Sequence, residues 1–164
     1  IGEGLSEGTQ VGPLANQRQL EKMEALIADA VALGATVLTG GKRIDRPGFF
    51  FEPTVLSDVP MSARIMHEEP FGPIAVIRPF DGIEDGLQEA NRLPYALSAY
   101  AFTRDARTAL DVGDGLEAGM IGINQYRIVA TELPFGGMKE SGQGSEGGRE
   151  GIGHYLTNKF ISQI

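Results

Sequence analysis

Three apolar runs between residues 74 and 123 decide the fold: Ile74-Ala75-Val76-Ile77-Arg78-Pro79-Phe80, Leu97-Ser98-Ala99-Tyr100-Ala101-Phe102 and Gly119-Met120-Ile121-Gly122-Ile123. Each has the length of a strand. The first is apolar enough, apart from Arg78, to be buried on both faces, which is typical of a parallel sheet. Helices are predicted between the runs, at 83–93 and at 106–116 after an Asp105 N-cap. This alternation predicts an α/β fold, with a parallel sheet and helices on both faces.

Upstream of these runs, the clearest helix of the sequence is predicted between Asn16 and Gly34. Asn16 can cap the first turn, and Gly34 can end the last one. A short strand is expected at 35–39, and 49–56 reads as an extended segment in which Pro53 suggests an edge position. The apolar residues that repeat at helical spacing are Leu20, Met23, Ile27, Ala30 and Val31.

Downstream, residues 133–153 are rich in glycine, so their backbone is expected to turn sharply or to approach another group closely. Residues 142–147 match G-x-G-x-x-G formally, but no strand precedes them, so a dinucleotide fingerprint is rejected. A short helix is predicted at 149–156. The alternation at 159–164 predicts a final strand, whose partner is either distant in the chain or on another chain.

Composition excludes several classes of function. The 164 residues are 41% hydrophobic, which suits a globular domain with a core, and the net charge is −8 with 14 scattered Lys and Arg. Binding to nucleic acid or to an anionic membrane is therefore not expected, and no apolar run could cross a bilayer. The chain has no Cys, hence no disulfide, thiolate metal site or Cys nucleophile of its own. The two histidines, His67 and His154, are too far apart for a metal site, and a cytoplasmic location is expected.

The stretch Met66-His67-Glu68-Glu69-Pro70-Phe71-Gly72-Pro73 is the first candidate site. It places two carboxylates and an aromatic ring on a rigid turn at the start of a strand, where a polar ligand could be bracketed. The alternative is a surface turn whose glutamates are merely solvated.

Four stretches, in order, resemble the NAD(P)-dependent aldehyde dehydrogenases, in particular those that act on semialdehydes. Residues 69–73 resemble the family's E-x-F-G-P signature, and Pro134-Phe135-Gly136-Gly137-Met138-Lys139-Glu140-Ser141-Gly142 resembles P-F-G-G-x-K-x-S-G. Residues 7–14 and 48–55 are similar to two further segments, one leading into a helix and one ending in P-T-V. The resemblance covers nearly the whole chain.

The resemblance implies an oxidoreductase that converts an aldehyde to a carboxylic acid. Members attack the aldehyde with a cysteine thiolate, pass hydride to the nicotinamide and hydrolyse the thioester. The Cys, its partner Glu and the dinucleotide-binding domain precede the first matched stretch in the family pattern. The chain therefore resembles the C-terminal third of such an enzyme, inactive alone, with 1–140 as part of the catalytic domain, 141–154 as a Gly-rich connection and 155–164 as an oligomerisation strand.

Four residues receive roles from the resemblance. Glu69 matches the residue that binds the hydroxyls of the nicotinamide ribose, and Phe71 matches the ring beside the nicotinamide. Phe135 matches an aromatic of the aldehyde pocket. Arg127, in the variable loop 125–132, could hold a substrate carboxylate in a fork, although a solvated loop charge is an equal alternative.

Two hypotheses follow. The first is an aldehyde dehydrogenase that uses NAD or NADP, a small-molecule aldehyde, the remainder of the same enzyme, and homo-oligomer contacts through 159–164. The second is a non-catalytic scaffold or oligomerisation module. The sequence leaves the aldehyde, the choice between NAD and NADP, and the oligomeric state open.

Overall fold

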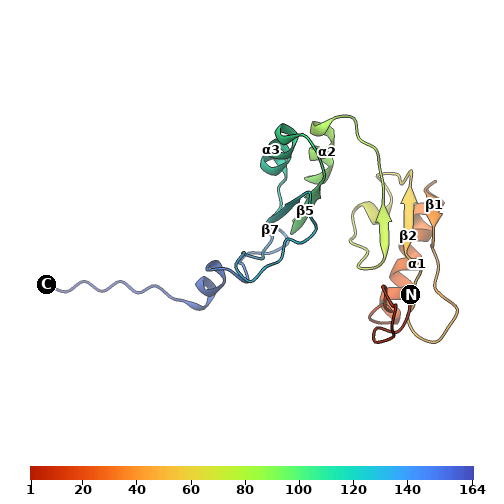
Figure 1. Ribbon diagram of the computed structural model, residues 1–164, viewed down its shortest axis with the longest axis horizontal. Helices are drawn as coiled ribbons and strands as arrows, with labels where there is room; N and C mark the ends of the chain where they lie inside the picture. Colours follow the sequence, from red (N-terminus) through yellow and green to blue (C-terminus); the bar gives the residue numbers. More distant parts are fainter. The chain divides into compact units, whose positions relative to one another are not determined.

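The computed structural model describes residues 1–164 and places them in two units, Ile1–Pro79 and Phe80–Ile164 (Figure 1). Each unit has its own helices and strands. The division into 1–140, 141–154 and 155–164 concerns segments of the family's enzyme and stays a prediction.

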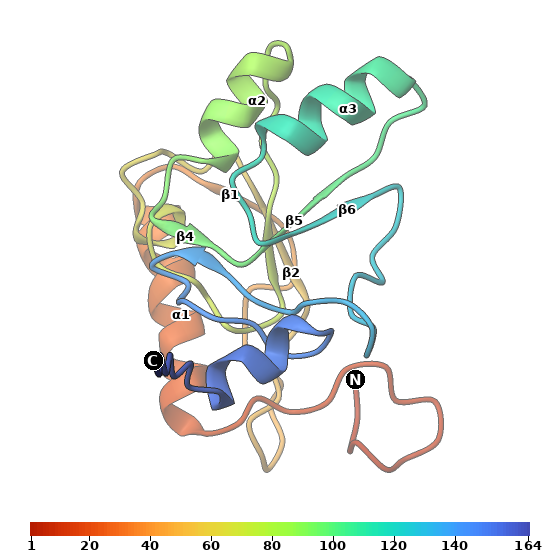
Figure 2. The same cartoon turned by 90° about the vertical axis from the view of Figure 1, so that its left-hand side faces the viewer.

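Helix α1 (Gln17–Ala32) is the main helix of the first unit and confirms the sequence prediction (Figure 2). The Asn16 side chain accepts a hydrogen bond from the Gln19 N–H at 3.0 Å, and Gly34 follows the helix with φ 108°. A cap of this kind satisfies an N–H group that the first helical turn leaves without a partner. Of the expected apolar face only Val31 is largely exposed, and the buried residues are Leu20, Met23, Leu26, Ile27 and Ala30.

The sheet of the first unit has the order β1 (Thr36–Thr39), β2 (Thr54–Ser57) and β3 (Ile74–Val76). Strand β2 is therefore central, pairing antiparallel with β1 and parallel with β3. The edge position predicted from Pro53 is wrong, because Pro53 stands just before the strand, where its missing N–H removes no ladder bond. The ladder begins at Thr54, whose N–H donates to the Pro73 carbonyl at 2.8 Å.

The core of the first unit lies between α1 and this sheet. Phe51 and Leu56 pack with the buried face of α1, and so do Val59, Ala63 and Ile65 from the segment around the short 3₁₀ helix η1 (Arg64–Met66). Burial of β3 on both faces is not observed, since Ala75 is exposed and Ile77 keeps 49% of its surface accessible. Ile74 and Val76 pack against the core, whereas Ala75 points to the opposite face of the strand, which is accessible.

The second unit contains the predicted strand–helix–strand unit. Strand β5 (Ser98–Ala101), helix α3 (Ala106–Gly115) and strand β6 (Met120–Ile123) follow one another, and the two strands pair parallel over their full length. The Asp105 carboxylate caps α3 by accepting from the Thr108 N–H at 2.7 Å, as predicted. Helix α2 (Ile83–Ala90) lies beside α3 (Figure 2).

The glycine-rich segment approaches its neighbours closely, as expected. A Cβ at Gly119 would collide with the Gly136 carbonyl oxygen, so only glycine allows the two backbones to lie so near. Strand β7 (Met138–Lys139) pairs antiparallel with β4 (Tyr95–Ala96). The α/β class is confirmed, with parallel pairs β2–β3 and β5–β6 beside antiparallel ones.

The C-terminal part contains the expected short helix but no strand. Residues Glu150–Tyr155 form η2, a 3₁₀ helix at the position of the short helix predicted at 149–156, and Gly151 and Gly153 disfavour a regular α-helix there. Residues 156–164 are exposed and have no regular structure. A strand requires a paired neighbour, and this chain supplies none for 159–164, so pairing with another chain stays a prediction. None of the helices is long and apolar enough to cross a membrane.

Candidate functional site

Glu69 and Phe71 lie together on the loop between η1 and β3 in the first unit. The Phe71 side chain is 72% exposed, and its backbone has φ 46°, which non-glycine residues rarely adopt. The Glu69 carboxylate is exposed and makes no hydrogen bond or ion pair in the structure. Both side chains are therefore free to contact a ligand.

The neighbouring carboxylate, Glu68, is occupied. The Arg64 guanidinium donates two hydrogen bonds to it, Nε to Oε1 at 2.8 Å and Nη2 to Oε2 at 3.2 Å. These hydrogen bonds hold the pKa of Glu68 below its usual value. Of the two adjacent glutamates, Glu69 is thus the one available to an outside donor.

A free carboxylate two residues from an exposed ring defines what the loop can bind. An ionised carboxylate accepts hydrogen bonds at both oxygens, so it can take both hydroxyls of a vicinal diol. An aromatic ring offers a flat apolar face to a second ring. The pair is therefore suited to a ligand that carries a diol close to a flat ring.

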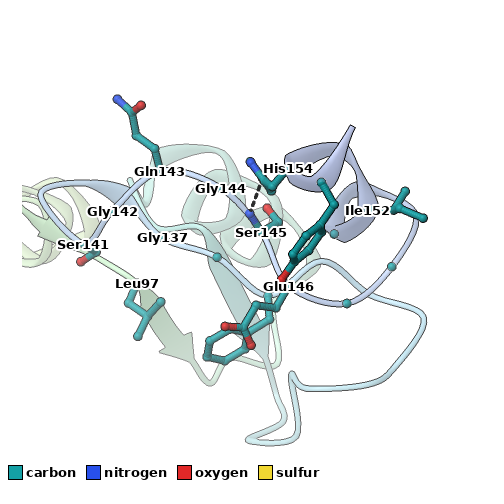
Figure 3. A pocket seen from close by; sticks show the side chains of 16 residues that line it. Leu97, Gly137, Ser141, Gly142, Gln143, Gly144, Ser145, Glu146, Ile152 and His154 are labelled. Atoms are coloured by element: carbon teal, nitrogen blue, oxygen red, sulfur yellow. Dashed lines mark hydrogen bonds between the residues drawn. The ribbon is translucent and has the colours of Figure 1, made fainter. Parts of the chain in front are cut away.

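Phe135 lies in the second unit, on the wall of a pocket of about 830 Å³ (Figure 3). Its backbone exchanges two hydrogen bonds of 2.7 Å with Glu146, which fixes the start of the glycine-rich segment. Seven of the other residues around the pocket are glycines, and the rest are Leu97, Ser141, Gln143, Ser145, Glu146, Ile152, His154 and Tyr155. Phe135 is half-buried, so part of its ring remains accessible.

One polar contact in this pocket was not anticipated from the sequence. The Ser145 N–H donates to His154 Nε2 at 3.0 Å, joining the glycine-rich loop to η2 (Figure 3). Sequence reasoning considered His154 only as a metal ligand. The glycine spacing marked the loop as unusual, but nothing in it identified the histidine as its partner.

Arg127 lies on the loop that follows β6, is exposed and forms no ion pair. The loop is held at two points just before this residue. The Asn124 carboxamide accepts from the Thr103 N–H at 2.9 Å, and the Tyr126 ring packs against Phe102 with centroids 4.8 Å apart. Tyr126 also contacts the Tyr100 ring at 5.7 Å. This cluster of three rings was missed by sequence reasoning, although Tyr100 and Phe102 alternate along one strand.

The four predicted site residues thus fall into two groups. Glu69 and Phe71 share one loop of the first unit, whereas Phe135 and Arg127 stand on separate segments of the second. Arg127 is not among the residues that line the Phe135 pocket.

Comparison with known proteins gives a consistent result. The family described as "Aldehyde dehydrogenase family" matches residues 1–161. Succinate-semialdehyde dehydrogenase of Paenarthrobacter nicotinovorans is 44% identical over 160 residues, which are 98% of this chain and 36% of that protein. The mitochondrial succinate-semialdehyde dehydrogenase of Rattus norvegicus is 45% identical over 161 residues, again 98% of this chain and 31% of the relative.

Solved structures agree in fold. An NADP-dependent enzyme of E. coli superposes with a TM-score of 0.92 at 44% identity, covering 95% of this chain and 32% of the enzyme. Betaine aldehyde dehydrogenase of Staphylococcus aureus, solved with NAD⁺, gives 0.90 at 38% identity, covering 95% and 32%. The chain spans about a third of the length of the curated relatives it matches.

Proposed function

This chain belongs to the aldehyde dehydrogenase family, and from that premise we propose that it forms the C-terminal part of an enzyme that oxidises an aldehyde to a carboxylic acid with NAD or NADP. The chain has no Cys and corresponds to about a third of its relatives. The nucleophile and most of the nucleotide site then belong to the remainder of the same enzyme, and the chain alone is inactive.

The observation that carries this proposal is the pairing of a free Glu69 carboxylate with an exposed Phe71 ring on one loop. In the enzyme, Glu69 accepts hydrogen bonds from the hydroxyls of the nicotinamide ribose. Phe71 limits the positions open to the nicotinamide ring, which favours a geometry close to that of hydride transfer. When bound, NAD(P) supplies the hydride acceptor for the oxidation.

We assign the substrate class from Arg127 and the relatives. A guanidinium without an ion pair can bind a carboxylate through two parallel hydrogen bonds, and two relatives bear the name succinate-semialdehyde dehydrogenase. Succinate semialdehyde carries such a carboxylate at the end opposite its aldehyde. The proposed substrate is therefore a semialdehyde with a terminal carboxylate, and Phe135 supplies apolar contact in the aldehyde pocket.

Steady-state kinetics of the full-length enzyme test this assignment. With Arg127→Met, the value of kcat/KM for succinate semialdehyde should fall by about tenfold or more, since a charge-assisted pair of hydrogen bonds is lost. Butanal, which lacks the carboxylate, should react at an unchanged rate. Arg104→Met is a matched control, because Arg104 is also exposed and forms no ion pair. Equal losses for both aldehydes would contradict the role of Arg127.

A non-catalytic scaffold is the second candidate, and the exposed apolar side chains at the C-terminus favour it. Phe160 is 91% exposed and Ile161 74% exposed, as expected of a segment that pairs with a second chain. Full-length protein that forms no reduced nicotinamide from any aldehyde, but whose homo-oligomer dissociates when 159–164 is removed, would support this candidate over the enzyme.

A further inference from the structure

Three successive carbonyl groups of the Glu69–Phe71 loop accept hydrogen bonds from side chains of helix α1. Lys22 Nζ donates to the Glu69 carbonyl oxygen at 2.8 Å. Gln19 Nε2 donates to the Pro70 carbonyl oxygen at 3.3 Å and also to that of Phe71. We propose that Gln19 and Lys22 are positioning residues, which set the direction in which Glu69 and Phe71 face the cofactor. This inference rests on the proposed function for those two residues.

The contacts between α1 and the segment 64–71 follow one another in order along the helix. Gln19 and Lys22 are one turn apart, and Asp29, two turns further on, accepts a hydrogen bond from the Arg64 N–H at 2.8 Å. Because Asp29 contacts residue 64 and Gln19 contacts residue 71, the segment runs antiparallel to α1. It is fixed to the helix at both ends, which leaves little freedom to the residues between.

The loop also lies close against the helix. A Cβ at Gly72 would collide with Met23 Sδ, so a larger residue at this point would require the buried Met23 side chain to move. The preceding Phe71 has φ 46°, a conformation that a bulky residue keeps only when surrounding contacts enforce it. The two carbonyl contacts of Gln19 flank this residue and supply such enforcement. The consequence is a Phe71 ring turned away from the core, with 72% of its surface exposed.

Gln19 is suited to this role by position and by chemistry. Its own N–H is capped by Asn16, so its backbone is defined by the first turn of the helix. Its side-chain amide carries two N–H donors, which match the two carbonyl acceptors of the loop. A glutamate of the same size has no donor when ionised. The pair Gln19→Glu and Gln19→Met therefore removes the donors while keeping a side chain of similar length.

A ¹⁹F spectrum of the full-length protein with 4-fluorophenylalanine at position 71 tests the hydrogen bonds of Gln19 to the loop, called the Gln19 clamp below, without an activity measurement. The parent should give one resonance, and Gln19→Glu should broaden it or add a second, because the loop then samples other conformations. Gln19→Met should act in the same direction, which keeps the test informative if the charged variant folds poorly. Gln17→Glu is the control, since the Gln17 side chain contacts only Glu21 on the exposed face. Spectra that coincide for all four proteins would overturn the proposal.

Kinetics separate this inference from the proposed function. Gln19→Met should raise the KM for NAD(P) and slow hydride transfer, each by up to about tenfold, the size expected when the preorganisation supplied by about one hydrogen bond is lost. Gln19→Lys, which keeps a donor, should restore part of both. If the ¹⁹F signal responds to Gln19 but Glu69→Gln and Phe71→Ala leave the kinetics unchanged, the clamp holds and the proposed function fails. If the kinetics of those two variants are impaired but the ¹⁹F signal does not change on substitution of Gln19, only the Gln19 clamp is disproved.

Discussion

The two units differ in how much of their apolar surface they bury themselves. The first unit encloses a core built on α1, whereas the large apolar residues of the second remain largely accessible. In the second unit the buried hydrophobic residues are Ala96, Val112 and Met120. Since apolar burial is the main favourable term in folding, the first unit has the means to be stable by itself. The second leaves apolar surface accessible, which under the proposed function the remainder of the enzyme covers.

The candidate site residues follow the same division. Glu69 and Phe71 sit on a loop bound to the helix that forms the core of its unit. Arg127 sits on a loop held by the hydrogen bond between Thr103 and Asn124 and by rings that are themselves exposed. The first site is preorganised by its own unit, and we expect the second to become ordered only when it is covered.

The largest effect is expected from a leucine pair, one from each unit. Leu26 is fully buried in α1, and Leu26→Ala should destabilise the first unit by about 3 kcal/mol, through lost burial and the cavity left behind. Leu110 in α3 is 67% exposed, and Leu110→Ala should cost less than about 0.5 kcal/mol. Hydrogen exchange measured separately for the amides of each unit checks this. Equal losses of stability in Leu26→Ala and Leu110→Ala would contradict the difference in apolar burial between the two units.

A smaller effect is expected at the cap of α1. Asn16→Ala should lower the stability of the first unit by about 1 kcal/mol, because the Gln19 N–H loses its acceptor. The loss should be the same at every pH, since an amide does not titrate. Urea unfolding at neutral and acidic pH measures it, with Asn16→Asp as the control that keeps an acceptor.

The smallest effect is expected at the cap of α3, and it should depend on pH. Hydrogen bonds from Thr108, first from its backbone N–H and then from its side chain, hold the pKa of Asp105 below its usual value. A carboxylate with a lowered pKa stabilises the folded state above its unfolded pKa, about 3.9, and loses this contribution as the pH falls through the folded value. Asp105→Asn should therefore remove the acid dependence of α3 amide exchange between neutral pH and pH about 3. An acid dependence that persists in Asp105→Asn would mean that another group is responsible.

The parts of the fold that were predictable are those encoded locally. Asn16, Asp105 and Gly34 act on residues within one helical turn of themselves, so the two capped helices and their limits could be inferred from sequence. The place of β2 at the centre of its sheet depends on pairing between distant segments, and Pro53 alone suggested the opposite. The short helix predicted at 149–156 is present as η2, but its 3₁₀ geometry was not predictable, because the sequence pattern does not distinguish a short 3₁₀ helix from a short α-helix.

The site was predictable only in part for the same reason. Glu69 and Phe71 belong to one short motif, and the structure places them together. Their attachment to Gln19 and Lys22 crosses some fifty residues of chain, a separation at which side-chain patterns carry no signal. The contact of Tyr126 with Tyr100 in β5 and with Phe102 just after it was likewise not predictable, because it depends on how the loop after β6 folds back.

A single-turnover measurement of reduced nicotinamide formation in the full-length enzyme tests the central claim most directly. Glu68 and Glu69 are adjacent, but Glu68 is bound by Arg64 and Glu69 is free. We predict that Glu69→Gln slows hydride transfer by about tenfold or more and that Glu68→Gln leaves it nearly unchanged, because the proposed function places Glu69, and not Glu68, at the cofactor ribose. Equal rates for Glu69→Gln and the parent enzyme would contradict the account.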